Sequence, residues 1–557
     1  MRKRRAYTLI LLISILSITL IGYSFFIEYR EKPYDDYLFT VSIKTDNKEL
    51  TIYPHQKYDN YYFFLPSYAQ YSDTRIVKNK KHKICLNDVE LSSQNQITEF
   101  QDNFPYTIYS DNKDMGSLII MYGSNIPSIF IETESGNIEK IKNDKNLEEP
   151  ASLIIINNGN IDYNNSIEYI TGRGNHSWEF DKKGWSFKLL EDASILGMKS
   201  YDQWILTSNV FDDSMGLRNY IAYNMAKEIG MEETSDFRFV DLYINKIYQG
   251  TYILFERIGQ GKNKLDIGDL DLLNDRSNKT IELDKLNPIQ EHNIDSYYSD
   301  KSYREFNSPN DISGGYIIER NVLTKTSNKE HIFTTSNNET FVVRYPNYVN
   351  KEELEYIESI VESVNRALHD DNYVDPVTNK KLEELIDIDS FVLKYLVDEV
   401  TKNEGAGSTS CYYYKKQGDD LLYAGPIWDY DKSVGRFDEW ADPNGIANAV
   451  LYRFGNPTDW YDKLYHNEKA YSLIKQYYKE KVKPFLSEMC EGKLEEQADE
   501  IRYSYEMNNV LWGEEFFRED FYLPGHIIEH VGDLDYSVNY LKDWMTVREA
   551  FLDKEWE

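Results

Sequence analysis

Cysteine and proline are both scarce in this sequence. The 557 residues include only three cysteines, Cys85, Cys411 and Cys490, and 15 prolines. Three widely separated cysteines cannot form the framework of a disulfide-rich domain, and their spacing matches no cysteine-based metal site. Tyrosine, asparagine, lysine and isoleucine are abundant. In a protein outside the cytoplasm, the near absence of cysteine suits a bacterium that does not rely on disulfides.

Positive charge is also in deficit. The formal net charge is −32 at pH 7, and because residues 2–5 (Arg-Lys-Arg-Arg) contribute +4, the rest of the chain carries −36. A field of this sign repels nucleic acid and anionic lipid, so we expect neither as a partner of the main body. An acidic balance also keeps many secreted proteins soluble, and this simpler interpretation has most of the weight.

A long uncharged run follows the N-terminal basic cluster. Residues 6–27 form a 22-residue stretch rich in Leu and Ile, and roughly 20 apolar residues suffice to cross a bilayer as a helix. The sequence therefore predicts a single-pass anchor at 6–27 in the cell membrane, a cytoplasmic tail at 1–5 and an extracytoplasmic body after Glu28. A cleaved signal peptide is the alternative, but residues 22–26 (Gly-Tyr-Ser-Phe-Phe) make a poor cleavage site.

Residues 36–118 have the pattern of short strands. The segment 38–43 alternates between apolar and polar residues, and the segment 61–65 ends at Pro66. We interpret this stretch as a small β accessory domain above the membrane. The apolar segment 117–121 would then begin a second domain, residues 119–557.

Mixed strands and helices are predicted in the second domain. Strand-like runs occur at 128–131 and 152–156, and a β-hairpin is expected to turn at Asn245 and Lys246. A helix should follow Asp213, because Leu217, Ile221, Met225 and Ile229 form one apolar stripe that ends before Gly230.

Further helices are expected toward the C-terminus. One spans 352–369, a second is capped by Asp389, and the last ends near 538–552. The polar segment 259–310 is interpreted as an insertion or mobile loop.

The densest candidate site is residues 423–435, Tyr-Ala-Gly-Pro-Ile-Trp-Asp-Tyr-Asp-Lys-Ser-Val-Gly. An apolar strand is expected to run into Asp429 and Asp431, which would then lie on the same face. Two such carboxylates repel each other, so a proton or a cation must lie between them. A hard cation such as Mg2+ resolves the conflict, whereas the alternative is an ordinary Asp-x-Asp at a strand end.

Positive charge gathers in a second segment. Residues 172–178 read Gly-Arg-Gly-Asn-His-Ser-Trp, and residues 182–189 read Lys-Lys-Gly-Trp-Ser-Phe-Lys-Leu. Lys188 should project from the polar face of a strand. A flexible ammonium with Arg173 nearby is what a polyphosphate needs, although a solvated basic face would have the same pattern.

Residues 400–415 provide the third segment. A helix ends there, a loop of small residues containing Asn403 follows, and a strand leads through a hairpin turn to Asp429. A polar loop before a hairpin that delivers a metal-binding Asp is the layout of a kinase catalytic segment. The usual signatures His-Arg-Asp and Asp-Phe-Gly and a glycine-rich nucleotide loop are missing from the sequence.

Taken together, these segments resemble the CotH family, named for a spore-coat protein and known as atypical, secretory-type protein kinases. The resemblance extends from about residue 119 to near the C-terminus. The matching segments are 173–178 with the Lys-Lys tail, 209–230, 242–256, 314–319, the stretch from 402 onward, and 425–431. It implies an α+β, diverged protein-kinase-like fold, preceded here by the β accessory domain and the transmembrane helix.

The resemblance also implies roles for residues. Asp429 would coordinate Mg2+ (or Mn2+), with Asp431 supporting it. Lys188 would hold the phosphates of ATP with help from Arg173 or Lys183. Glu256 or Glu319 would orient that lysine.

One position departs from the family pattern. Many members carry Asn-x-Asp, where the Asp looks like the catalytic base, but this chain reads Asn403-Glu404-Gly405. Glu404 could replace the base, or the protein could be a poor enzyme or a pseudokinase. The first hypothesis is therefore an ATP-dependent kinase acting on Ser or Thr of extracytoplasmic or spore-envelope proteins. The alternatives are a catalytically impaired binding or assembly protein, and an enzyme that modifies an envelope polymer.

Overall fold

The computed structural model describes residues 37–45, 48–231, 233–292, 300–321, 330–403, 405–436, 447, 459–517 and 529–556. The predicted anchor, residues 6–27, and the cytoplasmic tail lie outside these ranges. Across the part of the chain that is described, no helix is both long and apolar enough to cross a membrane. The anchor therefore stays a prediction.

The N-terminal part is built from strands, as the alternating pattern predicts. One sheet has the order β2-β1-β5-β8, and another has the order β3-β4-β10-β9-β6-β7. The two sheets share one apolar core, to which Val41, Phe63 and Ile108 contribute. The strands are β1 (Phe39–Thr45), β2 (Lys48–Ile52), β3 (His55–Lys57), β4 (Asn60–Leu65), β5 (Asp73–Lys78), β6 (Ile84–Leu86), β7 (Val89–Glu90), β8 (Gln94–Gln96), β9 (Tyr106–Ser110) and β10 (Lys113–Tyr122).

The next part is a closed barrel with the strand order β11-β12-β13-β14-β15-β17-β16. Its interior is apolar because alternate side chains point inward, among them Trp185, Phe187 and Leu189 of β14. The predicted hairpin forms, with Val240 opposite Tyr252. The strands are β11 (Ser128–Thr133), β12 (Glu149–Asn157), β13 (Asn160–Arg173), β14 (Gly184–Ala193), β15 (Tyr201–Thr207), β16 (Phe237–Ile244) and β17 (Ile247–Glu256).

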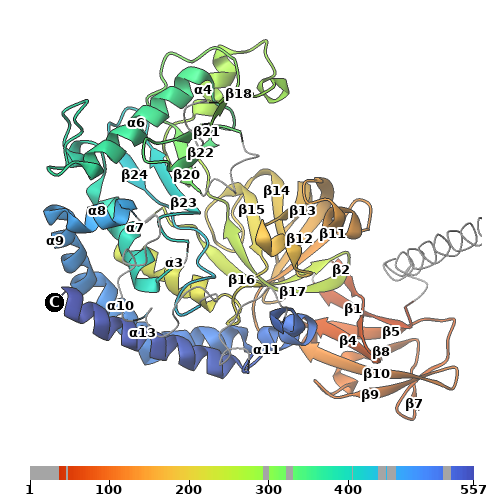
Figure 1. Ribbon diagram of the computed structural model, residues 1–557. Helices are drawn as coiled ribbons and strands as arrows, with labels where there is room; N and C mark the ends of the chain where they lie inside the picture. Colours follow the sequence, from red (N-terminus) through yellow and green to blue (C-terminus); the bar gives the residue numbers. More distant parts are fainter. Residues whose placement is uncertain are drawn as a thin grey trace, which may run out of the picture.

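Helix α3 (Leu217–Ile229) crosses the molecule between the barrel and the C-terminal half (Figure 1). The predicted apolar stripe is buried. The helix ends at Gly230, whose left-handed backbone (φ 109°) is easily reached only by glycine.

The C-terminal half contains a sheet of order β21-β22-β20-β23-β24 surrounded by helices (Figure 1). The strands are β20 (Tyr316–Arg320), β21 (Ile332–Thr334), β22 (Thr340–Tyr345), β23 (Cys411–Lys415) and β24 (Leu422–Ala424). The helices are α6 (Lys351–His369), α7 (Ile388–Thr401), α8 (Asp459–His466), α9 (Glu468–Tyr477), α10 (Lys483–Glu488), α11 (Leu494–Trp512) and α13 (Leu534–Trp556). The helices predicted at 352–369 and at the C-terminus are confirmed.

Two local predictions need correction. The segment 259–310 is not structureless, because it contains α4 (Leu270–Ser277), β18 (Ile289–His292) and β19 (Asp300–Tyr303). The cap of α7 is Asp387, whose side chain accepts from the N–H of Ser390, rather than Asp389. Both acids stand near the helix start, and only the backbone geometry distinguishes the cap.

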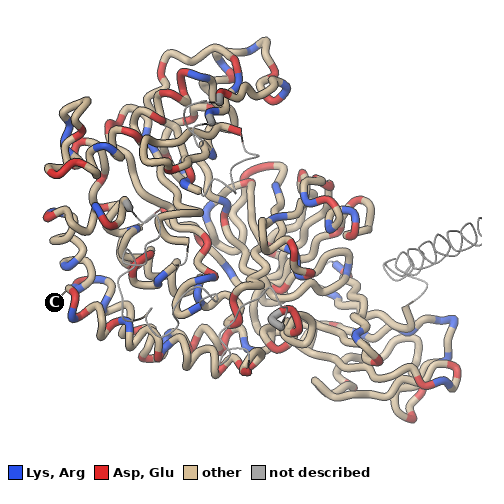
Figure 2. Tube along the Cα trace, viewed as in Figure 1, with Lys and Arg blue, Asp and Glu red and all other residues tan. Residues whose placement is uncertain are grey.

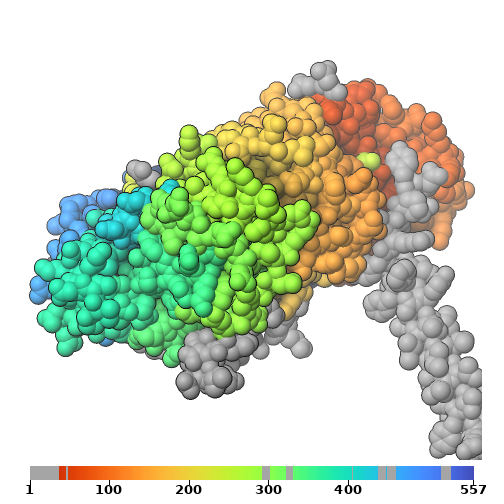
Figure 3. Space-filling view, turned by 90° about the horizontal axis from the view of Figure 1, so that it is seen from above, coloured from red at the N-terminus to blue at the C-terminus, as the bar shows by residue number. Residues whose placement is uncertain are grey.

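The β accessory domain lies at one end of an elongated molecule and the C-terminal half lies at the other (Figure 3). The core of the β accessory domain continues into the barrel, because Phe130 and Tyr243 of the barrel and Met507 of α11 pack in the same cluster. Acidic and basic residues are interspersed over the whole chain trace (Figure 2).

Candidate functional site

The two candidate metal ligands lie on a loop and not on a strand. Strand β24 ends at Ala424, and residues 428–436, here called the acidic loop, follow it without strand structure. Asp429 is exposed and has a left-handed backbone with φ 71°. The predicted strand is therefore wrong at this point, because a left-handed residue cannot continue a β-strand.

Asp429 and Asp431 influence each other electrostatically. Burial raises the pKa of Asp431 to about 8, and the negative charge of Asp429 adds to this shift, against the smaller opposing effect of Lys432. The direction agrees with the repulsion expected from two neighbouring carboxylates.

The loop after α7 contacts the acidic loop through Asn403. The Asn403 Nδ2 donates to the carbonyl of Asp429 at 3.3 Å, and its Oδ1 accepts from the N–H of Gly405 at 3.1 Å. Ser410 Oγ donates to Asp429 Oδ2 at 3.2 Å. Glu404, the candidate replacement for the base, lies outside the described residues.

Arg173, at the end of β13, reaches the acidic loop from the barrel. Its guanidinium carbon lies 4.7 Å from the ring centroid of Trp428, which packs on Phe255 of β17 at 5.6 Å. Burial lowers the pKa of Arg173 and Arg257 adds to this, whereas Tyr412 and Asp429 act against it. The structure therefore brings Arg173 and Asp429 together from distant parts of the chain.

The other predicted basic residues have local partners. Lys188 lies on the outer face of β14, and its Nζ is 2.8 Å from Glu168 Oε2 on the neighbouring strand β13. Lys183 Nζ donates to the carbonyl of Trp178 at 2.6 Å and lies 5.1 Å from the Trp178 ring. These contacts place both lysines along the barrel and not beside Asp429.

The expected pairing of Lys188 with Glu256 or Glu319 does not form. Glu256 is buried and binds Lys264 at 2.6 Å, in a pocket that Arg257 and Pro426 also line. Glu319 pairs with Arg344 and accepts from Asn321 at 2.6 Å. Sequence reasoning could not find Lys264, because it lies in the polar segment that was interpreted as a loop.

Several residues near Asp429 were missed. The ring of Tyr223 on α3 lies 6.3 Å from the ring of Tyr430 in the acidic loop, centroid to centroid, and the pKa of Tyr223 is raised mainly by burial and further by Asp429. Asn219, also on α3, accepts from the N–H of Tyr430 at 3.2 Å. The one signal for Asn219 was its place in the motif segment 209–230.

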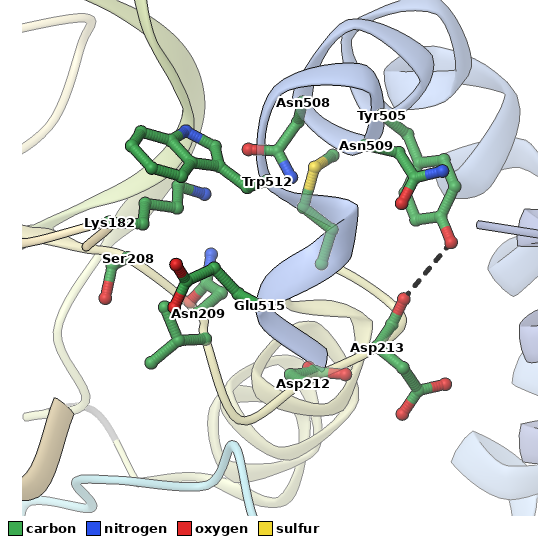
Figure 4. A pocket seen from close by; sticks show the side chains of 12 residues that line it. Lys182, Ser208, Asn209, Asp212, Asp213, Tyr505, Asn508, Asn509, Trp512 and Glu515 are labelled. Atoms are coloured by element: carbon green, nitrogen blue, oxygen red, sulfur yellow. Dashed lines mark hydrogen bonds between the residues drawn. The ribbon is translucent and has the colours of Figure 1, made fainter. Parts of the chain in front are cut away.

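A separate pocket lies between the barrel and α11 (Figure 4). Lys182 and Trp512 lie on one side of it, and Asp212 and Asp213 lie on the other. Burial lowers the pKa of Lys182 to about 7, and its Nζ donates to the carbonyl of Thr251 at 2.6 Å. The two aspartates of this pocket bind Arg218 at the start of α3, and Arg218 in turn donates from Nε to the carbonyl of Ser433 in the acidic loop at 3.1 Å.

Comparison with protein families identifies the chain. The model of the CotH kinase protein family matches residues 170–552. The chain belongs to the CotH kinase family. A comparison with curated proteins gives no match.

The CotH match covers α and β elements alike and begins near the end of β13. The acidic loop, Arg173 and Asn403 all lie within it, whereas the β accessory domain and the first barrel strands precede it. The segment from 173 to 431 that carries the resemblance is therefore part of the matched CotH region.

The residues of this CotH site fit a divalent cation that is shared with phosphates. Among the residues that the structure describes, no group of three or more His, Cys, Asp or Glu is arranged to hold a metal ion. Mg2+ usually binds one or two carboxylates and completes its shell with water and substrate phosphates. Two carboxylates on one loop, Asp429 and Asp431, match that donor set and not an all-protein cage.

Proposed function

We propose that this chain is a CotH-type phosphotransferase that binds ATP with Mg2+ or Mn2+. The observation that carries the proposal is the stacking of Arg173, from the end of β13, on Trp428 at 4.7 Å, because Trp428 belongs to the same loop as the carboxylates of Asp429 and Asp431. Bound ATP would supply the phosphoryl group, and the metal ion would neutralise its charge. Phosphoryl transfer depends mainly on such positioning and charge neutralisation.

In this proposal, different residues bind the cation and the phosphates. Asp429 and Asp431 hold the cation, and Asn403 fixes the carbonyl of Asp429 from the α7 side. Arg173 and Arg257 offer positive charge to phosphate oxygens. A guanidinium stacked on Trp428 is already oriented, so less freedom is lost when it binds an anion.

The fold is proposed to be a diverged protein-kinase fold. Helix α7, the loop at 403–410 and the hairpin β23–β24 lead to Asp429 in the order of a kinase catalytic segment. A metal-binding Asp after a hairpin would then correspond in role to the metal ligand of kinases.

A pseudokinase is the second candidate. It is favoured by Gly405, which leaves the expected position of the base without a side chain. A Cβ placed there would lie only 3.1 Å from Thr409 Cγ2, so Thr409 would have to shift slightly to accommodate a larger residue. In that case the protein would serve as a binding or assembly protein at the cell surface or spore coat.

The site of action is proposed from the sequence. A single-pass anchor at 6–27 would hold the body outside the cytoplasm, where the acceptor would be Ser or Thr of an extracytoplasmic or spore-envelope protein. Protease added to intact protoplasts should then digest the body and leave a small membrane-bound fragment. Full protection of the body would contradict this orientation.

Thermal unfolding tests the nucleotide site. The full chain in detergent should melt a few degrees higher with millimolar ATP and Mg2+, because a ligand at about 100 times its Kd adds about 2.7 kcal/mol of stability. EDTA should remove the shift. No shift with millimolar Mg-ATP would reject the phosphotransferase and favour the binding protein.

A further inference from the structure

The acidic loop has a backbone conformation that needs external support. Asp429 has φ 71°, in the left-handed region that residues other than glycine rarely adopt. Its side chain is exposed, so its own burial does not hold it there. Asn403 and Ser410 donate to Asp429 from outside the loop, and further support must come from the neighbouring residues of the loop.

Tyr430, between the two aspartates, is held at three separate atoms. Its N–H donates to Asn219 Oδ1 at 3.2 Å, its carbonyl accepts from Ser433 Oγ at 2.7 Å, and its hydroxyl donates to Asp398 Oδ1. The residue is completely buried. Both the backbone and the ring of Tyr430 are therefore fixed. The direction of the chain on either side of Tyr430 is fixed as well.

Asp398, which accepts from the hydroxyl of Tyr430, is itself immobilised. Asp398 is completely buried on α7, accepts from Lys394 Nζ at 2.9 Å and also accepts from the hydroxyl of Tyr461. Three donors to one carboxylate leave it little freedom to rotate. The ring of Tyr430 is thus tied to a rigid part of the core.

Asn219, which accepts from the N–H of Tyr430, lies in the first turn of α3, and this turn is itself held in place. Asp212 accepts from the N–H groups of Gly216 at 3.0 Å and Arg218 at 3.3 Å. Arg218 is completely buried, binds Asp212 and Asp213, and donates from Nε to the carbonyl of Ser433 at 3.1 Å. The first turn of α3 and the acidic loop are therefore one connected unit.

We propose that Tyr430 is a buried pivot and that Asn219 and Asp398 are positioning residues for the metal site. Asp429 and Asp431 are attached to either side of the held residue, so its orientation sets how far apart their carboxylates lie. Mg2+ demands near-ideal octahedral geometry, and groups that orient metal ligands affect affinity strongly. This inference rests on the proposed metal–nucleotide site.

Asn219→Ala tests the positioning role, with Asn224→Ala as its matched control on the same helix. The Asn224 side chain donates to the carbonyl of Tyr220 on its own helix, at 2.8 Å. Calorimetry with Mn-ATP on the full chain should show a Kd about tenfold higher for Asn219→Ala, since groups supporting metal ligands contribute about 10–100-fold. The Kd of Asn224→Ala should not change, and both variants should melt within a few degrees of wild type in EDTA.

Rescue distinguishes positioning from general damage. Asn219→Asp retains an acceptor for the Tyr430 N–H and should restore the affinity for Mn-ATP. If Asn219→Ala binds Mn-ATP like wild type, or if Asn219→Asp is as weak as Asn219→Ala, the proposal is overturned. If wild type itself binds no Mn-ATP, the proposed function fails.

Tyr430→Phe provides a second variant if Asn219→Ala does not fold. It removes only the hydroxyl that donates to Asp398. We expect a rise of about threefold in the Kd for Mn-ATP, smaller than for a lost backbone contact because the packing of the ring remains. An unchanged Kd would show that Asp398 has no positioning role.

Discussion

The two sides of the proposed site are held in different ways. The acidic loop is tied into the core from several elements: Arg436 Nε donates to the carbonyl of Phe211 at 2.9 Å, and the Tyr540 hydroxyl donates to the carbonyl of Gly435 at 2.8 Å. On the barrel side, Lys188 pairs with Glu168, and these side chains are 30% and 48% exposed. Ion pairs this exposed contribute little to stability.

This difference shows where substitutions should matter. The geometry of the acidic loop depends on buried polar groups. Removing the hydrogen-bond partner of such a group leaves it unsatisfied and destabilises the fold. On the barrel side, Arg173 is held by its stacking on Trp428, whereas Lys188 lies on the outer face of β14, where its side chain can move without disturbing the barrel. Substitutions in the acidic loop should therefore weaken nucleotide binding most, a substitution of Arg173 should weaken it less, and a substitution of Lys188 should change it little.

The largest expected effect is that of Asp429→Asn on metal-dependent nucleotide binding. Removing one member of a close charge pair costs about 2–5 kcal/mol, so the Kd for Mg-ATP should rise at least about 30-fold. Asn tolerates left-handed backbone as well as Asp does and can still accept from Ser410, so no new strain is introduced.

Thermal shift with and without Mg2+ measures this effect. The unliganded variant should be at least as stable as wild type, because its repulsion with Asp431 is relieved. A full Mg-ATP shift in the variant would show that the acidic loop is not the metal site, and the contrast between the two sides would disappear.

The sequence predicted elements well wherever periodicity alone decides them. The stripe from Leu217 to Ile229 became α3, and the alternation around Asn245 became the hairpin β16–β17. The prediction of a strand running into Asp429 was wrong, because an apolar run before an acidic residue does not reveal that this residue has a left-handed backbone.

The partners of charged residues were harder to predict than the elements. Glu256 pairs with Lys264 and not with Lys188, since that choice depends on how a polar segment folds back over the barrel. The resemblance implied that Arg173 or Lys183 assists Lys188 in holding the ATP phosphates, whereas the stacking of Arg173 on Trp428 is visible only in three dimensions.

Arg173→Lys should have the next largest effect. Lysine keeps the charge but loses the planar group that stacks on Trp428 and bonds phosphate bidentately. A loss of about 1–2 kcal/mol from a desolvated cation–π contact and its hydrogen bonds raises the Kd for ATP about tenfold.

Calorimetry on Arg173→Lys, with Arg238→Lys as control, measures this change. Arg238 lies on β16, and its Nη1 donates to the carbonyl of Phe237. An unchanged affinity in Arg173→Lys would mean that charge alone matters on the barrel side.

Gly405→Asp should have a smaller effect, in the direction of gain. The backbone of Gly405 is outside the left-handed region, so Asp can adopt it, but its Cβ would lie 3.1 Å from Thr409 Cγ2. Thr409→Ser removes that methyl group and keeps the hydroxyl that donates to Asn321 at 2.7 Å. The double variant should therefore accommodate the acid better than the single one.

Autophosphorylation with labelled ATP measures the gain. We expect a few-fold increase in the double variant, below the 10²–10⁴-fold of a well-placed base, and less in Gly405→Asp alone. No gain in either variant, with Mg-ATP binding intact, would favour the pseudokinase.

The smallest expected effect is that of Lys188→Ala, and it tests the tolerant side directly. The Lys188 ammonium binds Glu168, and this hydrogen bond raises the pKa of Lys188 against the smaller opposing effect of burial. Breaking so exposed a pair costs at most about 1 kcal/mol of stability, and the Kd for ATP should stay within twofold of wild type. Glu168→Ala is the matched variant, because it releases the lysine without removing its charge. If Lys188→Ala weakens ATP binding tenfold while Glu168→Ala strengthens it, the pair opens when nucleotide binds, and the barrel side takes part as directly as the acidic loop.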